Sequence, residues 1–352
     1  MLKSLRLENF TVFPEATLEF GKNLNVFVGE NGSGKTHILK AAYSAIAVSA
    51  RRNGSGSQEK AHWQVALGDK FQGVFRPDTL GRLASRCRGR SKFQLDYGFD
   101  DPALNLKFEV TTLGNVNLKV MPTARVEKLP VYLPTRELLT ISPGFVALYD
   151  TTHLLFEETW RDTCNLLGAP IAKGKKEAKI KQLLTPLESA MGGKVELDKT
   201  GRFYLNLATG SMEVHLVAEG LRKLATIARL ISTGSLLDKG YLFWDEPESN
   251  LNPKIIKTVA RTILLVARSG IQVFVATHSL FLMRELHILK RQEFKQLDAR
   301  CFGLHIEADG AVKVAQGATM DDIGSIAALD EDLQQSERYV DMEMGLNSDA
   351  GS

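Results

Sequence analysis

A glycine-rich loop near the start of the chain constrains the fold more than any other segment of the sequence. Residues 29–36 read Gly-Glu-Asn-Gly-Ser-Gly-Lys-Thr and match the pattern G-x-x-x-x-G-K-[ST] at every position. The preceding LNVFV is apolar enough for a short buried strand, and the following HILKAAYSAIAVSAR places its apolar residues on one face of a helix. Strand, loop and helix in this order predict an α/β fold that binds a phosphorylated ligand.

The residues of this loop suit the phosphates of a nucleotide such as ATP. Its glycines let the backbone approach closely, so that N–H groups point at phosphate oxygens, and the helix N-terminus favours an anion. Lys35 is expected to reach the β- and γ-phosphates, and the Thr36 hydroxyl to bind Mg²⁺. A glycine-rich turn that matches by chance is disfavoured by its flanking elements. The predicted ATP-binding residues are Gly29, Glu30, Asn31, Gly32, Ser33, Gly34, Lys35 and Thr36.

Two later strand ends carry the residue types that nucleotide hydrolysis needs. Residues 241–246, YLFWDE, form an apolar run that ends in Asp245 and Glu246. We expect Asp245 to hold Mg²⁺ through water and Glu246 to polarise the attacking water. The run QVFVATH ends at His278, which could position that water. A lone histidine there is more often structural, but within this set we predict catalytic roles for Lys35, Glu246 and His278.

Together, these segments resemble the ABC-type ATPase heads of the SMC, RecF and OLD-like group. The first 40 residues are similar to the N-terminus of that group, LFWDEPESNLNP resembles its Walker B and D-loop, and VFVATHS resembles its switch-histidine strand. VYLPTRELLTISPGFVALYD is similar to small bacterial AAA-labelled members, several of which act in phage defence. The resemblance implies an α/β P-loop NTPase of the ABC/SMC-head type, with an antiparallel β lobe and a short helical insertion.

The resemblance also implies residues that act on the nucleotide of a second subunit. The family signature begins a helix about 25 residues before Walker B, and Gly220 in LVAEGLRKLATIARLIS lies 25 positions before Asp245. Ala218 stands where the family usually has serine, which removes one hydroxyl contact. An ordinary amphipathic helix is the alternative interpretation. Ser249 and Asn250 would form the D-loop at the interface between the two subunits.

The family's Q-loop would fall at YLPTRE, residues 132–137, which contains no glutamine. Arg136 or Glu137 could couple the γ-phosphate to the insertion, or either could be a surface charge. Both alternatives stay open from the sequence alone.

The rest of the chain divides by composition and pattern. We predict an ATP-binding head from residues 1–48 and 194–318, a β lobe within 49–140, a helical insertion at 141–193 and an acidic tail at 319–352. Residues 49–60 are expected to form a loop. The expected strands are 63–67, 92–99, 104–112, 115–120, 194–198, 202–207, 212–216, 301–306 and 311–315, and the expected helices are 145–168 and 173–192.

Two clusters of positive charge could contact phosphate backbones, although such clusters are more often solvated. The first comprises Arg82, Arg86, Arg88, Arg90 and Lys92, and the second Lys173, Lys175, Lys176, Lys179 and Lys181. The acidic tail after Met320 would dock on a partner's basic surface or fold back on a basic loop of its own chain. Asp321 and Asp322 are expected to cap a helix.

The bulk composition excludes several classes. The net charge of +3 is too small to argue for nucleic acid by itself, and the three cysteines form no CxxC pair. Apolar runs are too short for a membrane span, and no signal peptide is evident, so a cytoplasmic protein is expected. The combined hypothesis is a Mg²⁺-dependent ATPase that forms an ATP-dependent homodimer and controls a separate effector protein in bacterial antiviral defence or a toxin–antitoxin-like system. A RecF/SMC-like repair ATPase that binds DNA is the alternative.

Overall fold

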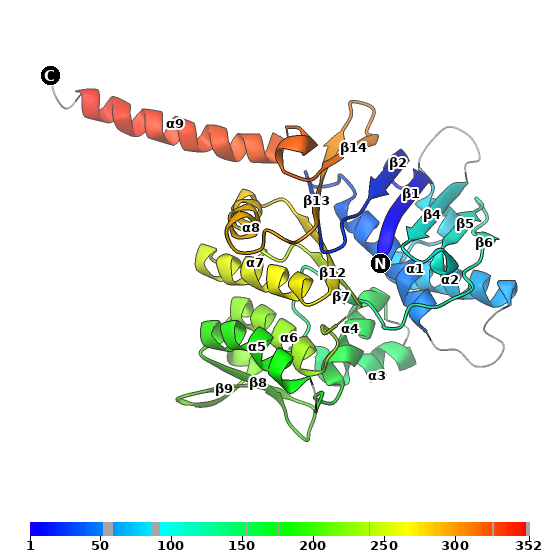
Figure 1. Ribbon diagram of the computed structural model, residues 1–352, viewed down its shortest axis with the longest axis horizontal. Helices are drawn as coiled ribbons and strands as arrows, with labels where there is room; N and C mark the ends of the chain where they lie inside the picture. The colour runs from blue at the N-terminus through cyan, green and yellow to red at the C-terminus, as the bar shows by residue number, and fades with distance from the viewer. Residues whose placement is uncertain are drawn as a thin grey trace.

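The computed structural model describes residues 1–51, 59–85, 92–152, 154–174, 176–238, 240–325 and 327–349, and a six-stranded sheet forms its centre (Figure 1). The strand order is β14-β13-β3-β12-β11-β7, and all neighbours are parallel except β14. Every residue of β3, β11 and β12 is buried, as is typical of parallel strands covered on both faces. The strands are β3 Leu24–Gly29, β7 Val131–Leu133, β11 Gly240–Asp245, β12 Ile271–Thr277, β13 Ala299–Ile306 and β14 Val312–Gly317.

The antiparallel lobe expected from the sequence is present as a five-stranded sheet with the order β2-β1-β4-β5-β6. In β4 every second residue is buried, which is the pattern of a strand with one face on a core. β1 and β2 come from the first 48 residues, although the predicted domain division itself stays a prediction. The strands are β1 Leu2–Phe10, β2 Phe13–Glu19, β4 Phe93–Phe99, β5 Leu106–Val110 and β6 Val116–Val120.

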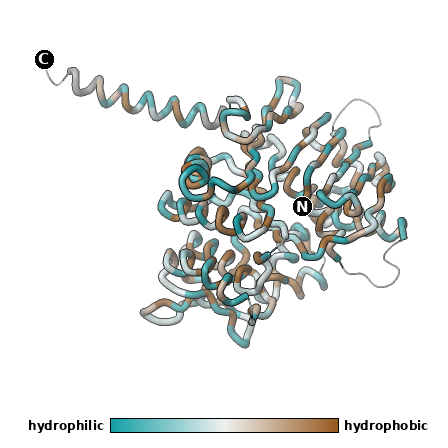
Figure 2. Tube along the Cα trace, in the orientation of Figure 1, coloured by the Kyte–Doolittle hydropathy of each residue, from teal (hydrophilic) through white to brown (hydrophobic). Residues whose placement is uncertain are grey.

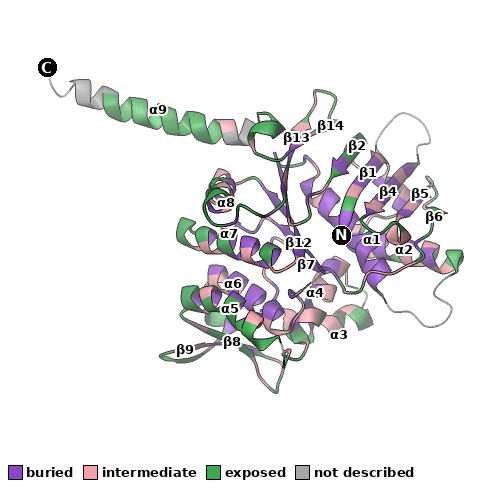
Figure 3. Ribbon diagram, in the orientation of Figure 1, coloured by how far each residue is buried: buried purple, intermediate pink, exposed green. Residues whose placement is uncertain are grey.

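Helix α1, Lys35–Ala50, lies in the core between these two sheets (Figure 3). It is buried at nearly every position from Ile38 onward, because side chains of both sheets pack around it in one cluster. This burial explains why the helix AAYSAIAVSA is small and apolar all round rather than on one face only. The phosphate loop, which immediately precedes α1, therefore rests on a rigid support.

The opposite face of the central sheet is covered by helices, and a small three-stranded sheet with the order β10-β9-β8 packs against two of these helices (Figure 1). Their apolar side chains form a second core, and brown and teal residues alternate along the helices in Figure 2. These elements are α4 Glu158–Gly168, α5 Glu177–Met191, α6 Glu219–Ser232, α7 Pro253–Arg268, α8 Leu280–Gln292, β8 Gly193–Leu197, β9 Phe203–Leu207 and β10 Gly210–Glu213.

The prediction of a strand at 63–67 was wrong, because these residues belong to helix α2, Lys60–Phe75. Trp63, Leu67, Phe71 and Val74 are its buried apolar residues, and their spacing is that of one helical face. The short window around Val65 and Ala66 concealed this period. The predicted loop 49–60 starts inside α1, and its residues 52–58 lie outside the described part of the chain.

The predicted helices have different limits in the structure. The segment 145–168 contains two helices, α3 Ser142–Thr152 and α4, and α5 starts at Glu177 rather than at 173. The predicted strand 212–216 is split between β10 and a 3₁₀ turn, Val214–Leu216. Asp321–Ile323 also form a 3₁₀ turn, in which the Asp322 carboxylate accepts from the Thr319 N–H (2.8 Å), so no α-helix starts at this point.

The acidic tail forms helix α9, Ala327–Asp349, which extends away from the body in Figure 1. Its residues from Glu331 to Met344 are exposed, including Leu333 and Tyr339. The alternative in which the tail folds back onto its own chain is therefore not seen. Docking on a partner stays a prediction.

A buried cluster of charges joins the helical insertion to the lobe. The side chain of Lys70 on α2 is fully buried and bonds both Glu158 (3.0 Å) and Asp162 of α4. The Tyr43 hydroxyl of α1 donates to the same Asp162 (2.6 Å). A buried ammonium between two carboxylates is tolerated only while all partners are present. The cluster thus fixes α4 against α1 and α2.

Lys70→Ala should therefore destabilise the fold strongly, by about 3 kcal/mol. Glu158 and Asp162 would lose their one fully buried cation and, within the described part of the chain, keep only the more exposed arginines Arg51 and Arg161 as cationic partners. Lys313→Ala is the matched control, since the Lys313 side chain is 75% exposed in its ion pair with Glu307. Its expected effect is under about 0.5 kcal/mol. Urea denaturation followed by tryptophan fluorescence measures both. Equal stability of the two variants would contradict the assigned role of the cluster.

Candidate nucleotide site

In the glycine-rich loop of residues 29–36, here called the phosphate loop, each of the three glycines is favoured for a different reason. A Cβ on Gly34 would lie 2.7 Å from side-chain atoms of Val12 and Phe13, and one on Gly29 would lie 2.8 Å from the Leu304 carbonyl oxygen. Gly32 adopts φ +86° and faces open space within 4 Å of where its Cβ would be. The loop is thus packed tightly against the lobe below and open above Gly32, where a phosphate would need room.

Lys35, the first residue of α1, points back over this loop. Its Nζ donates to the carbonyl oxygens of Gly29 (2.7 Å) and Glu30 (2.8 Å), and the residue is buried. Burial lowers its pKa, an effect opposed by the negative charges of Glu246 and Asp245. The ammonium is therefore held in the loop close to the two strand-terminal carboxylates, and its role in phosphate binding stays a prediction.

Thr36 and Asp245 form the best-defined contact between the loop and β11. The Thr36 hydroxyl donates to Oδ2 of Asp245 (2.8 Å), and the Tyr132 hydroxyl lies 3.4 Å from the same oxygen. The other carboxylate oxygen, Oδ1, is buried without a hydrogen-bond partner. Burial raises the pKa of Asp245 to about 6, and the nearby Glu246 charge adds to this shift.

This arrangement fits Mg²⁺ by its chemistry. A hydroxyl and a carboxylate with a free buried oxygen are hard oxygen donors, which Mg²⁺ prefers, and Mg²⁺ commonly takes its other ligands from water and phosphate oxygens. Among the described residues no group of three or more His, Cys, Asp or Glu side chains forms a metal cage. Thr36 and Asp245 are thus the residues that would hold the ion beside a nucleotide.

Glu246 and His278 face each other across the ends of β11 and β12. Oε1 of Glu246 lies 3.2 Å from Nδ1 of His278, and both side chains are partly open to solvent. Glu246 has φ +46°, a left-handed conformation that costs a non-glycine residue of order 1 kcal/mol. Its N–H donates to the Ala276 carbonyl (2.9 Å), which holds this turn in place. A carboxylate fixed next to an imidazole and reachable by water can act as a general base.

The predicted signature and D-loop residues lie together within one chain. Helix α6 starts at Glu219 with Ala218 as its N-cap, and Ala218 gives no side-chain cap. A Cβ on Gly220 would lie 3.1 Å from Leu251 and 3.2 Å from Ile255. Gly220 therefore allows the start of α6 to pack closely on the D-loop, which is a reason that the sequence analysis did not identify.

Two polar contacts hold these segments together. Lys223 Nζ donates to the carbonyl oxygen (2.6 Å) and to Oγ (2.7 Å) of Ser249, and Asn250 Nδ2 donates to Glu219 (3.1 Å). Ser249 Oγ also lies 2.9 Å from the Glu246 carbonyl oxygen. The D-loop is thus hydrogen-bonded both to the signature helix and to the turn that carries Glu246.

Glu137, one of the two candidates at the Q-loop position, is not a surface charge. Its carboxylate lies 2.9 Å from Arg222 Nε of α6 and accepts from the Leu139 N–H (3.0 Å) and the Thr140 hydroxyl (2.7 Å). Arg136 is exposed. Glu137 therefore joins the start of the helical insertion to the signature helix.

Three polar residues near the site were missed by the sequence analysis. Tyr132 lies beside Asp245, Glu248 contacts the end of β12, and Lys40 of α1 bonds Glu157 (2.5 Å). Glu248 had a sequence signal, since it is the third acid of DEPES. Tyr132 and Lys40 had none, because each is brought to its partner only by tertiary packing.

The basic clusters are partly neutralised where the structure describes them. Arg82 lies 3.0 Å from Asp78, and Lys92 lies 2.8 Å from Glu109. Asp238 pairs with both Lys176 (2.9 Å) and Lys179 (3.2 Å). The remaining arginines of the first cluster and one lysine of the second lie outside the described residues: Arg86, Arg88, Arg90 and Lys175.

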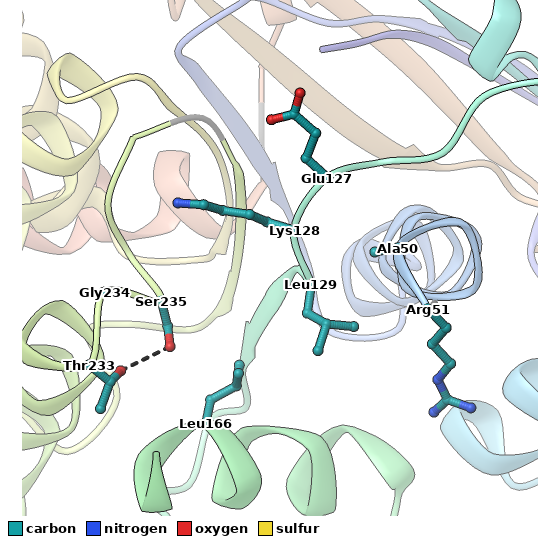
Figure 4. Close-up of a pocket in the computed structure, with 9 residues that line it drawn as sticks. All are labelled: Ala50, Arg51, Glu127, Lys128, Leu129, Leu166, Thr233, Gly234 and Ser235. Atoms are coloured by element: carbon teal, nitrogen blue, oxygen red, sulfur yellow. Dashed lines mark hydrogen bonds between the residues drawn. The ribbon is translucent and has the colours of Figure 1, made fainter. Parts of the chain in front are cut away.

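A separate cavity of about 570 Å³ lies where α1 and α6 end (Figure 4). Arg51, Lys128, Leu166 and Ser235 are among its lining residues, and none of the predicted nucleotide-site residues lines it. It is therefore distinct from the site above. No described helix combines the length and apolarity that crossing a bilayer requires.

Comparison with known proteins agrees with the geometry. A family described as "AAA domain, putative AbiEii toxin, Type IV TA system" matches residues 111–284, and an "AAA domain" family matches residues 4–76. The DNA replication and repair protein RecF of Clostridium kluyveri is 50% identical over 42 residues, 12% of each chain. RecF of Pediococcus pentosaceus is 39% identical over 91 residues, 26% of this chain and 24% of RecF. The chain thus matches about a quarter or less of the length of these relatives.

Solved structures extend the likeness of fold over most of the chain. An SMC head bound to the C-terminal winged-helix domain of ScpA has a TM-score of 0.57 at 14% identity and covers 91% of this chain and 98% of that one. An Smc head with an extended coiled coil, bound to the C-terminal domain of ScpA and derived from Pyrococcus furiosus, has a TM-score of 0.52 at 12% identity. It covers 96% of this chain and 99% of that one. The predicted α/β fold of SMC-head type is confirmed.

The buried Asp245 carboxylate predicts a pH-dependent effect of Asp245→Asn in the nucleotide-free protein. The pKa of Asp245 in the folded protein, about 6, exceeds the ordinary value. Between about pH 4 and 6 the folded state therefore retains a proton that the unfolded state has lost. The contribution of Asp245 to wild-type stability falls as the pH rises through that range. Asn keeps an acceptor for Thr36 without the charge. The variant should be up to about 3 kcal/mol more stable than wild type at pH 7.5, and this advantage should vanish near pH 4. Denaturant melts at both pH values test this, and a constant difference would contradict it.

Proposed function

We propose that this chain, an ATPase of the SMC/RecF-like ABC type, hydrolyses ATP with Mg²⁺ at sites shared by two copies and uses this cycle to control a separate protein. The observation that carries the proposal is the Glu246–His278 contact of 3.2 Å beside the Thr36–Asp245 contact of 2.8 Å. These two contacts support the proposal, because a carboxylate, an imidazole and a pair of oxygen donors lie together at one sheet edge, next to Lys35.

Each side chain has a distinct role in the proposed reaction. The loop N–H groups and Lys35 bind and orient the phosphates. Thr36 and Asp245 would hold Mg²⁺, which would neutralise charge on the phosphate oxygens. Glu246 accepts a proton from the attacking water, and His278 orients that water and the γ-phosphate. The partial exposure of Glu246 and His278 allows water to reach them before the site closes.

The proposal includes a second copy of the chain because the signature and the D-loop of each chain are packed together as one unit. Gly220 at the α6 N-terminus and Asn250 at the D-loop are held together by the Glu219–Asn250 contact and the close packing on Leu251. A helix N-terminus favours an anion, so this unit suits the γ-phosphate bound by the partner copy. ATP would then stabilise the closed pair through contacts that ADP lacks, and hydrolysis would release them.

The controlled effector is proposed from family likeness and surface features. The family matched over residues 111–284 is described as a putative AbiEii toxin of a type IV toxin–antitoxin system. Helix α9 offers an exposed, acidic arm with apolar side chains such as Leu333 and Tyr339 to a partner. These observations support a role in bacterial defence or in a toxin–antitoxin-like module.

Glu246→Gln should lower the ATP turnover number by at least about 100-fold, since a general base typically contributes 10²–10⁴. The same variant should accumulate as a dimer with ATP and Mg²⁺ in size-exclusion chromatography with light scattering, because the closed state would not be resolved by hydrolysis. Glu15→Gln on β2, whose side chain is 66% exposed, is the matched control and should behave as wild type. Lys35→Ala should bind no fluorescent ATP analogue. Unchanged turnover in Glu246→Gln would contradict the general-base assignment.

The second candidate is a DNA-binding ATPase, favoured by the match of part of the chain to proteins named for DNA replication and repair. In that case the chain should retain a 30-base-pair duplex only with ATP, and the retention should fall steeply with salt as phosphate contacts are lost. An electrophoretic shift assay at two salt concentrations, with Lys35→Ala as the ATP-binding control, measures this. Retention that neither ATP nor salt alters would exclude this candidate.

A further inference from the structure

The structure assigns a positioning role to Glu248, the third acid after β11, in fixing the His278 imidazole for the reaction. One carboxylate oxygen, Oε1, accepts from the Thr277 hydroxyl (2.5 Å) and from the His278 N–H (3.3 Å). The same oxygen lies 3.9 Å from His278 Nδ1. The inference rests on the proposed function, because it concerns how that site holds its histidine.

These contacts set the backbone turn at the end of β12. The Thr277 hydroxyl, which donates to Glu248, also accepts from the Ser279 N–H (3.0 Å), and Ser279 in turn caps α8. The chain on both sides of His278 is therefore held by one Thr–Glu clamp, defined as the Thr277 hydroxyl and the Glu248 carboxylate. The fixed backbone sets the position of the His278 Cα and Cβ, from which the imidazole reaches to 3.2 Å from Glu246.

The second oxygen of Glu248 indicates that the residue is not present for stability. Glu248 is 6% exposed, and its Oε2 is buried without a hydrogen-bond donor. A buried carboxylate with one oxygen unsatisfied costs free energy, which the charges of Lys35 and Lys223 offset only in part. A smaller apolar residue would avoid that cost, so the carboxylate is better explained by its action on His278.

Glu248 also connects His278 to the D-loop. Its carbonyl oxygen accepts from the Leu251 N–H (3.1 Å), so the residue belongs to the same turn as Ser249 and Asn250. A displacement of the D-loop would therefore also move the residue that holds the backbone on both sides of His278. Glu248 therefore connects the D-loop to His278 within the same chain.

The decisive experiment is a set of turnover measurements that combine changes at Glu248, Thr277 and His278. Glu248→Ala and Thr277→Val each remove the clamp. Each should lower the turnover number about 10–100-fold, the range found for residues that orient metal-bound histidines. The KM for ATP should stay within about 3-fold of wild type, because neither change touches the phosphate loop. Glu248→Gln keeps an acceptor oxygen for both donors and should restore most of the turnover. Glu307→Ala, remote on the β13–β14 hairpin, is the matched control.

The role through His278 is tested by non-additivity. In a His278→Ala background, Glu248→Ala should cause no further loss of turnover, because the group that it positions is already gone. Losses that multiply in the double variant would overturn the inference. Full activity of both Glu248→Ala and Thr277→Val, with His278→Ala impaired, would overturn it as well.

A second readout does not depend on hydrolysis. In histidine-labelled protein, the imidazole resonances of His278, identified by their absence in His278→Ala, should shift in Glu248→Ala and Thr277→Val and stay near wild type in Glu248→Gln and Glu307→Ala. A wild-type chain that binds ATP without turnover would contradict the proposed function, while these spectra would still decide the clamp. Unshifted resonances in both clamp variants would refute the positioning role independently.

Discussion

The candidate site depends on the parallel pairing of β3, β12 and β11 in a single register. This register sets Asp245 opposite Ala276 and Thr277 opposite Val28, so the three strands finish at one edge of the sheet. The loops at the carboxyl ends of these parallel strands therefore lie next to one another. This edge of the sheet is where α/β proteins commonly bind ligands. A shift of one residue in β11 would turn Asp245 to the other face and separate it from Thr36.

Backbone strain and buried polar atoms without hydrogen-bond partners occur together at this edge of the sheet. Glu246 and Asn250 both adopt left-handed backbone conformations, and Asp245 and Glu248 each keep one buried oxygen without a partner. These features lower stability, and they persist because the buried strands and the two cores around them are well packed. The free energy that the cores supply thus partly offsets the cost of these strained turns and unpaired carboxylate oxygens.

Much of the candidate site was predictable from the sequence because each motif is tied to a particular arrangement of strand, loop and helix. Lys35 and Thr36 follow a loop pattern that only a strand–loop–helix unit satisfies, and strand-terminal Asp245, Glu246 and His278 could be placed at one edge without knowing the strand order. The limits of α2 were not predictable from the short window used, since Trp63 and Leu67 show their period only over a full helix.

Other contacts were hidden for a different physical reason. From the sequence, Glu137 could be either a coupling residue or a surface charge, and only the structure shows that it lies against Arg222. The Lys70 cluster likewise joins residues of α1, α2 and α4, which no local pattern relates. Such pairs depend on how separate segments fold against one another, and a single sequence contains no direct record of that.

The enclosure of α1 between two sheets has a consequence for how a nucleotide could be sensed. A helix walled in on every side has little freedom to tilt or slide, so the loop at its head should receive phosphate as a preformed cradle with little induced fit. The response to the third phosphate must then be expressed elsewhere, in the turns after β7, β11 and β12 that border solvent. In that case the turns after β7, β11 and β12 would distinguish ATP from ADP, and the glycine-rich loop before α1 would keep the same conformation with either nucleotide.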